Sequence, residues 1–107
     1  MGNRNSFTST SAGAVTETAV GLENLVLKTG YADGAVIYAL FGTNDGTIVL
    51  KHIFEDGTEI AYQTVSCSAG ILSVINLTHK LPHIKVYYTH AGAGAVNIET
   101  VTSLGQI

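Results

Sequence analysis

Turn-forming residues recur at intervals of roughly ten residues from Glu17 onward, and short apolar runs fill the stretches between them. Asn44-Asp45-Gly46 and Asp56-Gly57 supply the small or positive-φ residues that tight hairpin turns require. This spacing is typical of a sandwich or a barrel. It predicts an all-β fold, an antiparallel β-sandwich resembling a jelly roll, with strands over 18–29, 35–42, 47–54, 58–67, 70–77, 84–90 and 95–103.

A two-residue period supports these strands. Ile84, Val86 and Tyr88 share one face of the strand predicted over 84–90, and Pro82 precedes it, where a missing N–H costs little. One segment leaves an alternative open, because 21–28, with the sequence GLENLVLK, fits two helical turns as well as a strand.

The first sixteen residues differ from the rest, since Ser, Thr, Asn, Gly and Ala dominate them and no period is visible. Arg4 is their one charge and Phe7 their one large side chain. Such a segment cannot form a core of its own, so we expect a flexible arm over 1–16 that orders against a neighbouring subunit, attached to a sandwich domain over 17–107. The alternative is a disordered terminus without a role.

Charged residues make up only 12% of the chain, against roughly 25% in a typical soluble domain. Neutral, short side chains cover the surface instead, which favours contact with other protein surfaces over strong solvation. At 107 residues the core is small, and a single cysteine cannot form an intramolecular disulfide. We therefore expect a homo-oligomer, with a trimer as the favoured state. The alternative is a monomer with a weakly charged surface.

The same composition argues against other partners. The net charge is −3 and the five basic residues are scattered, so no stripe for phosphate contacts is visible and direct binding of nucleic acid is not expected. The longest uncharged apolar run, 34–41, is too short to span a bilayer, and the N-terminus lacks the apolar core of a secretory signal. We expect a soluble protein without a membrane partner.

Candidate catalytic and metal-binding residues are few. His79 and His83 have the spacing of a helical metal site, but Pro82 disfavours that helix. Cys67 has no basic neighbour to activate it, and no G-x-S-x-G motif presents Ser66 or Ser68. The carboxylates near two predicted turns lack the spacing of a calcium loop; they are Asp45, Glu55, Asp56 and Glu59. We expect no enzyme activity, no cofactor and no metal.

The five tyrosines are the most specialised side chains of the chain. Tyr87 and Tyr88 are adjacent, so they point to opposite faces of a strand and one of them faces outward. An outward tyrosine anchors a protein interface or stacks on a sugar. The second use gives an alternative function, a carbohydrate- or receptor-binding module with Tyr62, Tyr87 or Tyr88 as the stacking platform.

A neutral N-terminal arm followed by a glycine-punctuated sandwich resembles the small structural proteins of tailed-bacteriophage virions, in particular capsid decoration (cement) proteins. The resemblance extends over most of the chain. It is carried by the segments 1–16, 24–31 (NLVLKTGY), 68–70 (SAG) and 87–94 (YYTHAGAG).

This resemblance implies a jelly roll or similar sandwich that caps the outside of a capsid, often as a trimer, and holds neighbouring subunits together. The implied partner is the major capsid protein or another virion protein, and the implied location is the capsid surface after synthesis in the host cytoplasm. No catalytic residue comes with the resemblance. The residues expected at the assembly interface are Arg4, Phe7, Tyr31, Tyr87 and Tyr88.

Overall fold

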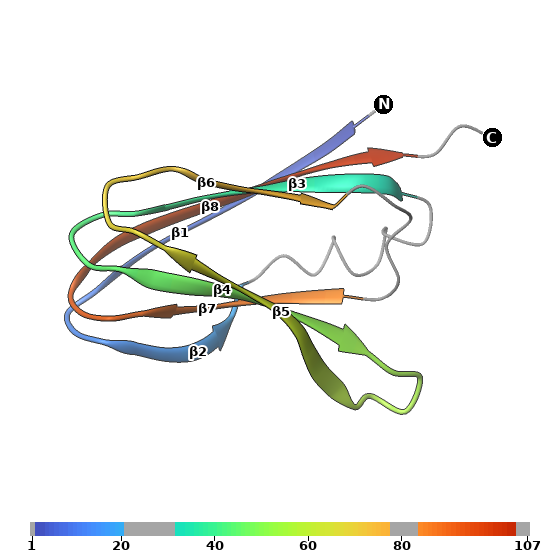
Figure 1. The fold of residues 1–107 in the computed structure, drawn as a ribbon, viewed down its shortest axis with the longest axis horizontal. Helices are drawn as coiled ribbons and strands as arrows, with labels where there is room; N and C mark the ends of the chain where they lie inside the picture. The colour runs from blue at the N-terminus through green and yellow to red at the C-terminus, as the bar shows by residue number, and fades with distance from the viewer. Residues whose placement is uncertain (1, 21–31, 78–83, 105–107) are drawn as a thin grey trace.

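Two four-stranded antiparallel sheets make up the computed structural model, which describes residues 2–20, 32–77 and 84–104 (Figure 1). No helix occurs among these residues, so the all-β prediction is confirmed. The strands are β1 (Gly2–Ser11), β2 (Val15–Ala19), β3 (Ala32–Phe41), β4 (Gly46–Ile53), β5 (Glu59–Cys67), β6 (Ser73–Leu77), β7 (Ile84–His90) and β8 (Gly94–Leu104).

The connectivity is that of a jelly roll. Sheet A has the order β1-β8-β3-β6 and sheet B the order β2-β7-β4-β5. The pairs β1/β8, β2/β7, β3/β6 and β4/β5 are nested, as in one long hairpin rolled up so that alternate pairs fall into different sheets. The contacts β3/β8 and β4/β7 then join these pairs within each sheet.

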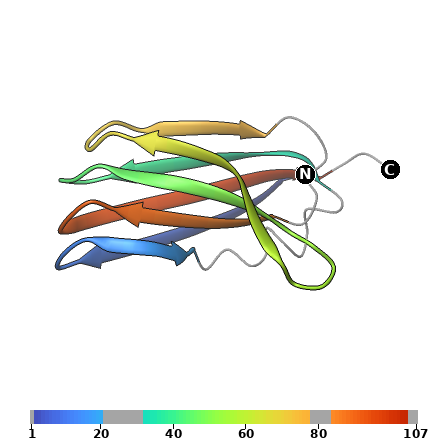
Figure 2. The ribbon, with the colours of Figure 1, turned by 60° about the horizontal axis from the view of Figure 1, so that its bottom comes forward.

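The core lies between the sheets and is built by the two-residue period. In β7, every second residue from Ile84 to His90 is buried. β3 contributes Ile37, Ala39 and Phe41 from the opposite layer. Figure 2 shows the two layers from a second direction, with the strands of each layer running roughly alongside one another. This packing of two inward faces explains why apolar alternation in the sequence located β7 to the residue.

Most of the segment predicted as an N-terminal arm is a strand in the structure. Residues 2–11 form β1, which pairs with β8 without a break from Gly2 opposite Ser103 to Ser11 opposite Gly94. Ser and Thr occupy both faces of β1, so the segment has no period that would identify it as a strand. Its conformation is specified by its partner β8 and by Phe7, which packs against the core. The predicted strand over 18–29 overlaps only the end of β2, and most of it, with the helical alternative at 21–28, lies outside the described residues.

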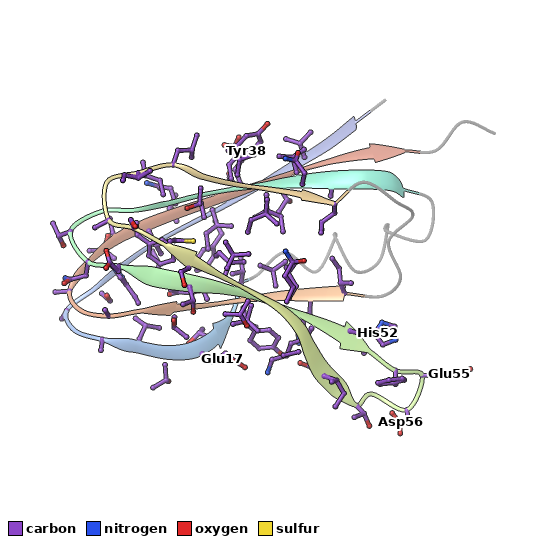
Figure 3. The ribbon with its side chains drawn as sticks, viewed as in Figure 1. Glu17, Tyr38, His52, Glu55 and Asp56 are labelled. Atoms are coloured by element: carbon purple, nitrogen blue, oxygen red, sulfur yellow. The ribbon has the colours of Figure 1, made fainter. Side chains whose placement is uncertain are left out.

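The β4–β5 hairpin extends beyond the rest of sheet B (Figure 1). β5 is bulged opposite Leu50 and Lys51. The predicted turn is present at the tip, where the Thr58 N–H donates to Oδ1 of Asp56 at 2.9 Å and Gly57 has φ +94°. A positive φ of this size suits glycine because it has no Cβ. Glu55 and Asp56 therefore lie at the far end of the molecule, beyond His52 (Figure 3).

Candidate functional site

The outward side of sheet A is the most unusual surface of the fold, because it carries apolar side chains where an antiparallel sheet normally faces water. On β3, Ile37 and Ala39 are buried, so Tyr38 between them points outward, as do Val36 and Leu40 on either side. Leu72, Val74 and Leu40 are 55%, 50% and 37% exposed. We call this surface the sheet A face; its apolar members are Val36, Tyr38, Leu40, Leu72, Val74 and Val101.

Register brings these side chains together from three strands. Tyr38 on β3 is opposite Val74 on β6 and Glu99 on β8, and Val36 is opposite Val101. Directly opposite residues have Cβ atoms about 5 Å apart, so the apolar groups form one continuous surface. A shallow groove of about 610 Å³ follows it, with Tyr38 and Leu72 in its lining.

Polar groups in the groove come mainly from β1 and β8. Ser6, Thr8, Asn97 and Glu99 line it beside Tyr38. Among the side chains that the structure describes on this face, Glu99 is the one that carries a charge. A surface with few charges has a low free-energy cost of desolvation, and a protein contact requires its surface to be desolvated.

The outward side of sheet B is different, because its charged groups are bound to one another. Tyr87 on β7 donates its hydroxyl hydrogen to Glu59 on β5, and the Lys51 ammonium lies 4.3 Å from the centre of the Tyr87 ring. Lys51 also forms an ion pair with Glu17 on β2, and Lys85 Nζ lies 3.7 Å from a Glu59 oxygen. Figure 3 shows Glu17 and Tyr38 on opposite sides of the sandwich.

These contacts change the acidity of two groups. The hydrogen bond to Glu59 raises the pKa of Tyr87 to about 12, with burial as the second cause. The same hydrogen bond lowers the pKa of Glu59, and the charges of Lys85 and Lys51 lower it further. Both pKa shifts are those expected when these side chains bond to one another. The resulting network links β2, β4, β5 and β7, and few of its polar groups are left to bind a ligand.

The end of the sandwich where β4 begins holds the polar groups closest to a catalytic arrangement. Cys67 and His90 are both buried, and both are opposite Gly46 in the register. The space above Gly46 is filled by the ring of Phe41, which lies 5.2 Å from the His90 ring in an edge-on contact. The thiol contacts the Val65 carbonyl oxygen and the imidazole contacts Asn44 and Phe41, so the two groups have separate partners.

His90 is held by the loop beside it. Its Nε2 lies 3.2 Å from the Asn44 carbonyl oxygen, whereas Nδ1 is buried without a hydrogen-bond partner among the described residues. A shallow pocket of about 320 Å³ nearby has hydroxyl groups from Thr47, Ser66 and Thr89 in its lining. Over residues 2–20, 32–77 and 84–104, no three His, Cys, Asp or Glu side chains gather as metal ligands would.

Of the predicted interface residues, the three whose side chains the structure describes, Phe7, Tyr87 and Tyr88, do not share one outer surface. Tyr88 is buried, at 4% exposure, and Phe7 packs on it with ring centroids 5.5 Å apart. Tyr87 faces outward on the other side of the same strand, which confirms that the two adjacent tyrosines diverge. Arg4 belongs to β1 opposite Val101, and Tyr31 lies outside the described residues.

The sheet A face was not anticipated from the sequence, although one signal pointed to it. The run 34–41 is apolar without interruption. Successive residues of a strand point to opposite faces, so a strand that is apolar throughout presents apolar side chains on both faces. His79 and His83, the suggestive histidine pair, lie outside the described residues, and the part of the chain that is described contains no helix able to cross a membrane.

Comparison with known proteins places the chain by its fold. No protein-family model matches it, and neither does any curated protein sequence. A Bacillus endospore appendage protein, from a family described as forming disulfide-linked pili, has 17% identity and a TM-score of 0.58 over 98% of this chain and 88% of its own. The SPBc2 prophage-derived protein YomS has 12% identity and a TM-score of 0.55 over 95% and 94%.

The Yersinia pseudotuberculosis-derived mitogen has 12% identity and a TM-score of 0.48 over 100% of this chain and 90% of its own. At such identities the likenesses concern the fold. The chain is a small jelly-roll protein whose two outer faces differ, one apolar and the other charged and internally paired.

Proposed function

We propose that this protein is a non-enzymatic structural subunit of a virion, which decorates the outside of a capsid and bridges neighbouring subunits. The observation that carries the proposal is the sheet A face, a surface on a rigid sheet with half-exposed Leu72 and Val74 and a single described charge. Apolar surface of this kind marks a contact with another protein.

The distribution of charge over the two faces supports an oriented attachment. The ion pairs of Lys51 with Glu17 and of Lys85 with Glu59 lie on the outward side of sheet B. A subunit that binds through sheet A therefore presents this solvated face to the medium. Because a shell repeats its binding sites by symmetry, many modest contacts of this type give a durable coat.

The fold likenesses agree with an assembly role. Of the solved structures named above, one with a TM-score of 0.55 is described as prophage-derived, and one with a TM-score of 0.58 belongs to a family described as forming pili. In this proposal the subunit forms a homo-oligomer, and its partner is the major capsid protein. The composition and the resemblance to decoration proteins favour a trimer. The subunit acts on the capsid surface after synthesis in the host cytoplasm.

Substitution of the face tests this proposal. Leu72→Lys and Val74→Lys together place two charges on exposed apolar positions without entering the core. Each removes about 1 kcal/mol or more of buried apolar contact in the assembly, so binding to undecorated particles should weaken at least about tenfold. Thr64→Lys on the outward side of β5 is the matched control. Equal co-sedimentation of both variants with particles would contradict the proposal.

A second function, carbohydrate binding, is favoured by one observation. Tyr38 lies in the groove beside Asn97 and Glu99, an aromatic ring next to amide and carboxylate groups that can bind sugar hydroxyls. Two of the tyrosines first considered are less suited, because Tyr88 is buried and Tyr87 is engaged with Glu59; the side chain of the third, Tyr62, lies outside the described part of the structure. A saturable response to a sugar that is lost in the Tyr38→Ala variant would support carbohydrate binding. If no sugar on a glycan array bound the protein, the structural role would stand.

A further inference from the structure

Four strands lie at the edges of the two sheets: β1 and β6 in sheet A, and β2 and β5 in sheet B. An edge strand carries N–H and C=O groups that have no partner in the ladder, and another chain can pair with them. Proteins avoid this by making edge strands short, bulged, or rich in proline and lysine.

Three of the four edges have such protection. β2 and β6 are only five residues long, and the pairing of β2 with β7 shifts between Val15 and Thr18. β5 is longer, but it is bulged opposite Leu50 and Lys51. Each of these edges offers a short or interrupted row of backbone groups.

β1 has none of these features. It is ten residues long, and its register with β8 is continuous from Gly2 to Ser11. Its sequence, GNRNSFTSTS, contains no proline, no lysine and no carboxylate. Alternate residues of an edge strand direct their N–H and C=O away from the sheet, so β1 presents a long, regular and nearly neutral row of free backbone groups.

We propose that a second copy of this chain pairs with β1 along this edge, antiparallel and about a two-fold axis, to join two copies of sheet A into one eight-stranded sheet. The contact is made of backbone hydrogen bonds and small side chains. The biological purpose of this pairing rests on the proposed assembly role. The pairing itself is expected of the purified protein in solution. It is separate from any contact around a three-fold axis.

The pleat of β1 restricts the register of this pairing. Ser6 and Thr8 are exposed on the sheet A face, whereas Phe7 points to the core side. A two-fold axis perpendicular to the sheet keeps the two outer faces on one side, so directly opposite residues must share a face and hence have the same parity. The central registers are therefore those about Ser6 or about Phe7.

Both registers are compatible with the side chains of β1. The register about Ser6 places Arg4 opposite Thr8 of the second copy, and the register about Phe7 places it opposite Thr10. Arg4 never meets its own counterpart, so no like charges oppose one another. Ser and Thr otherwise face small polar residues, which permits close approach and cross-strand hydrogen bonds.

The pairing would also enlarge the docking surface. In the joined sheet, the two sheet A faces lie side by side and point in the same direction. A dimer could then contact two sites of a shell at once, and the second contact would be intramolecular.

Sedimentation and cysteine cross-linking of the purified protein test the inference. We expect a species of twice 11.2 kDa at micromolar concentration, or of six times 11.2 kDa if the proposed three-fold contact forms as well. Single variants Ser6→Cys and Thr8→Cys cover the two registers: Ser6→Cys links to itself in the first, and a mixture of both variants links in the second. Asn76→Cys, exposed on the same face at the β6 edge, is the control, and the native Cys67 is buried.

Slower amide exchange in β1 with rising protein concentration would support the same pairing in the unmodified chain. The inference is overturned if the protein sediments only as an 11.2 kDa species at high micromolar concentration, or if Asn76→Cys cross-links as fast as the β1 variants. A monomer that still binds particles would refute this pairing alone. A dimer that binds no particles would refute the proposed capsid role and leave the pairing in place.

Discussion

At the scale of single residues, Gly46 shows how closely the two layers approach. A Cβ at this position would collide with the ring of Phe41 and with the Thr89 carbonyl oxygen. Phe41 is fully buried, and the Thr89 carbonyl belongs to the backbone of β7, so neither group can move aside without disturbing a sheet.

Gly46→Ala should therefore lower the free energy of unfolding by about 1–3 kcal/mol, the usual cost of forcing atoms into a packed core. Gly13→Ala is the control, because nothing lies within 4 Å of a Cβ there and its effect should stay within about 0.5 kcal/mol. Urea denaturation of the two variants measures the difference. Equal stability would show that the core around Phe41 is loosely packed.

The hydrogen bond between Tyr87 and Glu59 contributes stability near neutral pH, and this contribution is lost toward both ends of the pH scale. The pKa of Glu59 is lowered from 4.5, so its contribution is present above pH 4.5 and is lost as the pH falls through the lowered value. The pKa of Tyr87 is raised from 10.0 to about 12, so its contribution is present below pH 10.0 and is lost as the pH rises toward 12.

Glu59→Gln should accordingly return the pKa of Tyr87 toward 10.0, since the carboxylate is the largest cause of its shift. Tyr87→Phe should weaken the loss of stability below pH 4.5, because Glu59 then titrates nearer its ordinary value. Ultraviolet titration of tyrosinate and urea midpoints across the pH range measure the two effects. An unchanged Tyr87 titration in Glu59→Gln would mean that the two side chains do not interact in solution.

At the scale of elements, β1 shows the limit of what the sequence predicts. The strand over 84–90 was predicted to the residue, because Ile84, Val86 and Tyr88 alternate with polar residues. β1 was not predicted, because a strand of Ser and Thr has no apolar period and depends on β8, which lies about ninety residues away in the sequence. The sheet A face was missed for the same reason: Tyr38, Val74 and Glu99 become neighbours only through register.

Phe7 is the side chain that anchors β1, and its substitution tests whether the strand belongs to the folded domain. Phe7→Ala removes a half-buried ring from Tyr88 and should cost about 2 kcal/mol, less than the loss of a fully buried phenylalanine. Thr8→Ala, exposed on the other face of β1, is the control. If Phe7→Ala had no effect on stability, residues 2–11 would behave as the arm that the sequence suggested.

At the scale of the whole molecule, the two faces predict how attachment responds to salt. The sheet A face has few charges, whereas the charged groups Lys51, Glu59 and Lys85 lie on the opposite side. Contacts between neutral surfaces are little affected by ionic strength, and contacts between exposed charges are screened.

Particles should therefore retain the protein when the sodium chloride concentration is raised to 1 M, a concentration at which the screening length is about 3 Å. The measurement is the protein remaining with particles after sedimentation. Lys51→Ala should behave like the wild type in this assay, since its ammonium contacts Glu17 and Tyr87 of its own chain. Release of the protein by salt would contradict docking through the sheet A face and would indicate that the charged, outward side of sheet B makes the contact.

The nested connectivity has a consequence for synthesis. β8 lies between β1 and β3, and β7 lies between β2 and β4, so one of the two inner positions in each sheet is filled by a strand made late. Until the ribosome has released them, β1 and β2 have no ladder partner among the described strands, and the early half of the chain cannot close either layer. Folding that depends on such distant pairing is slow. A chain that is cut short before β8 therefore fails as a whole and cannot enter an assembly as a partly formed subunit.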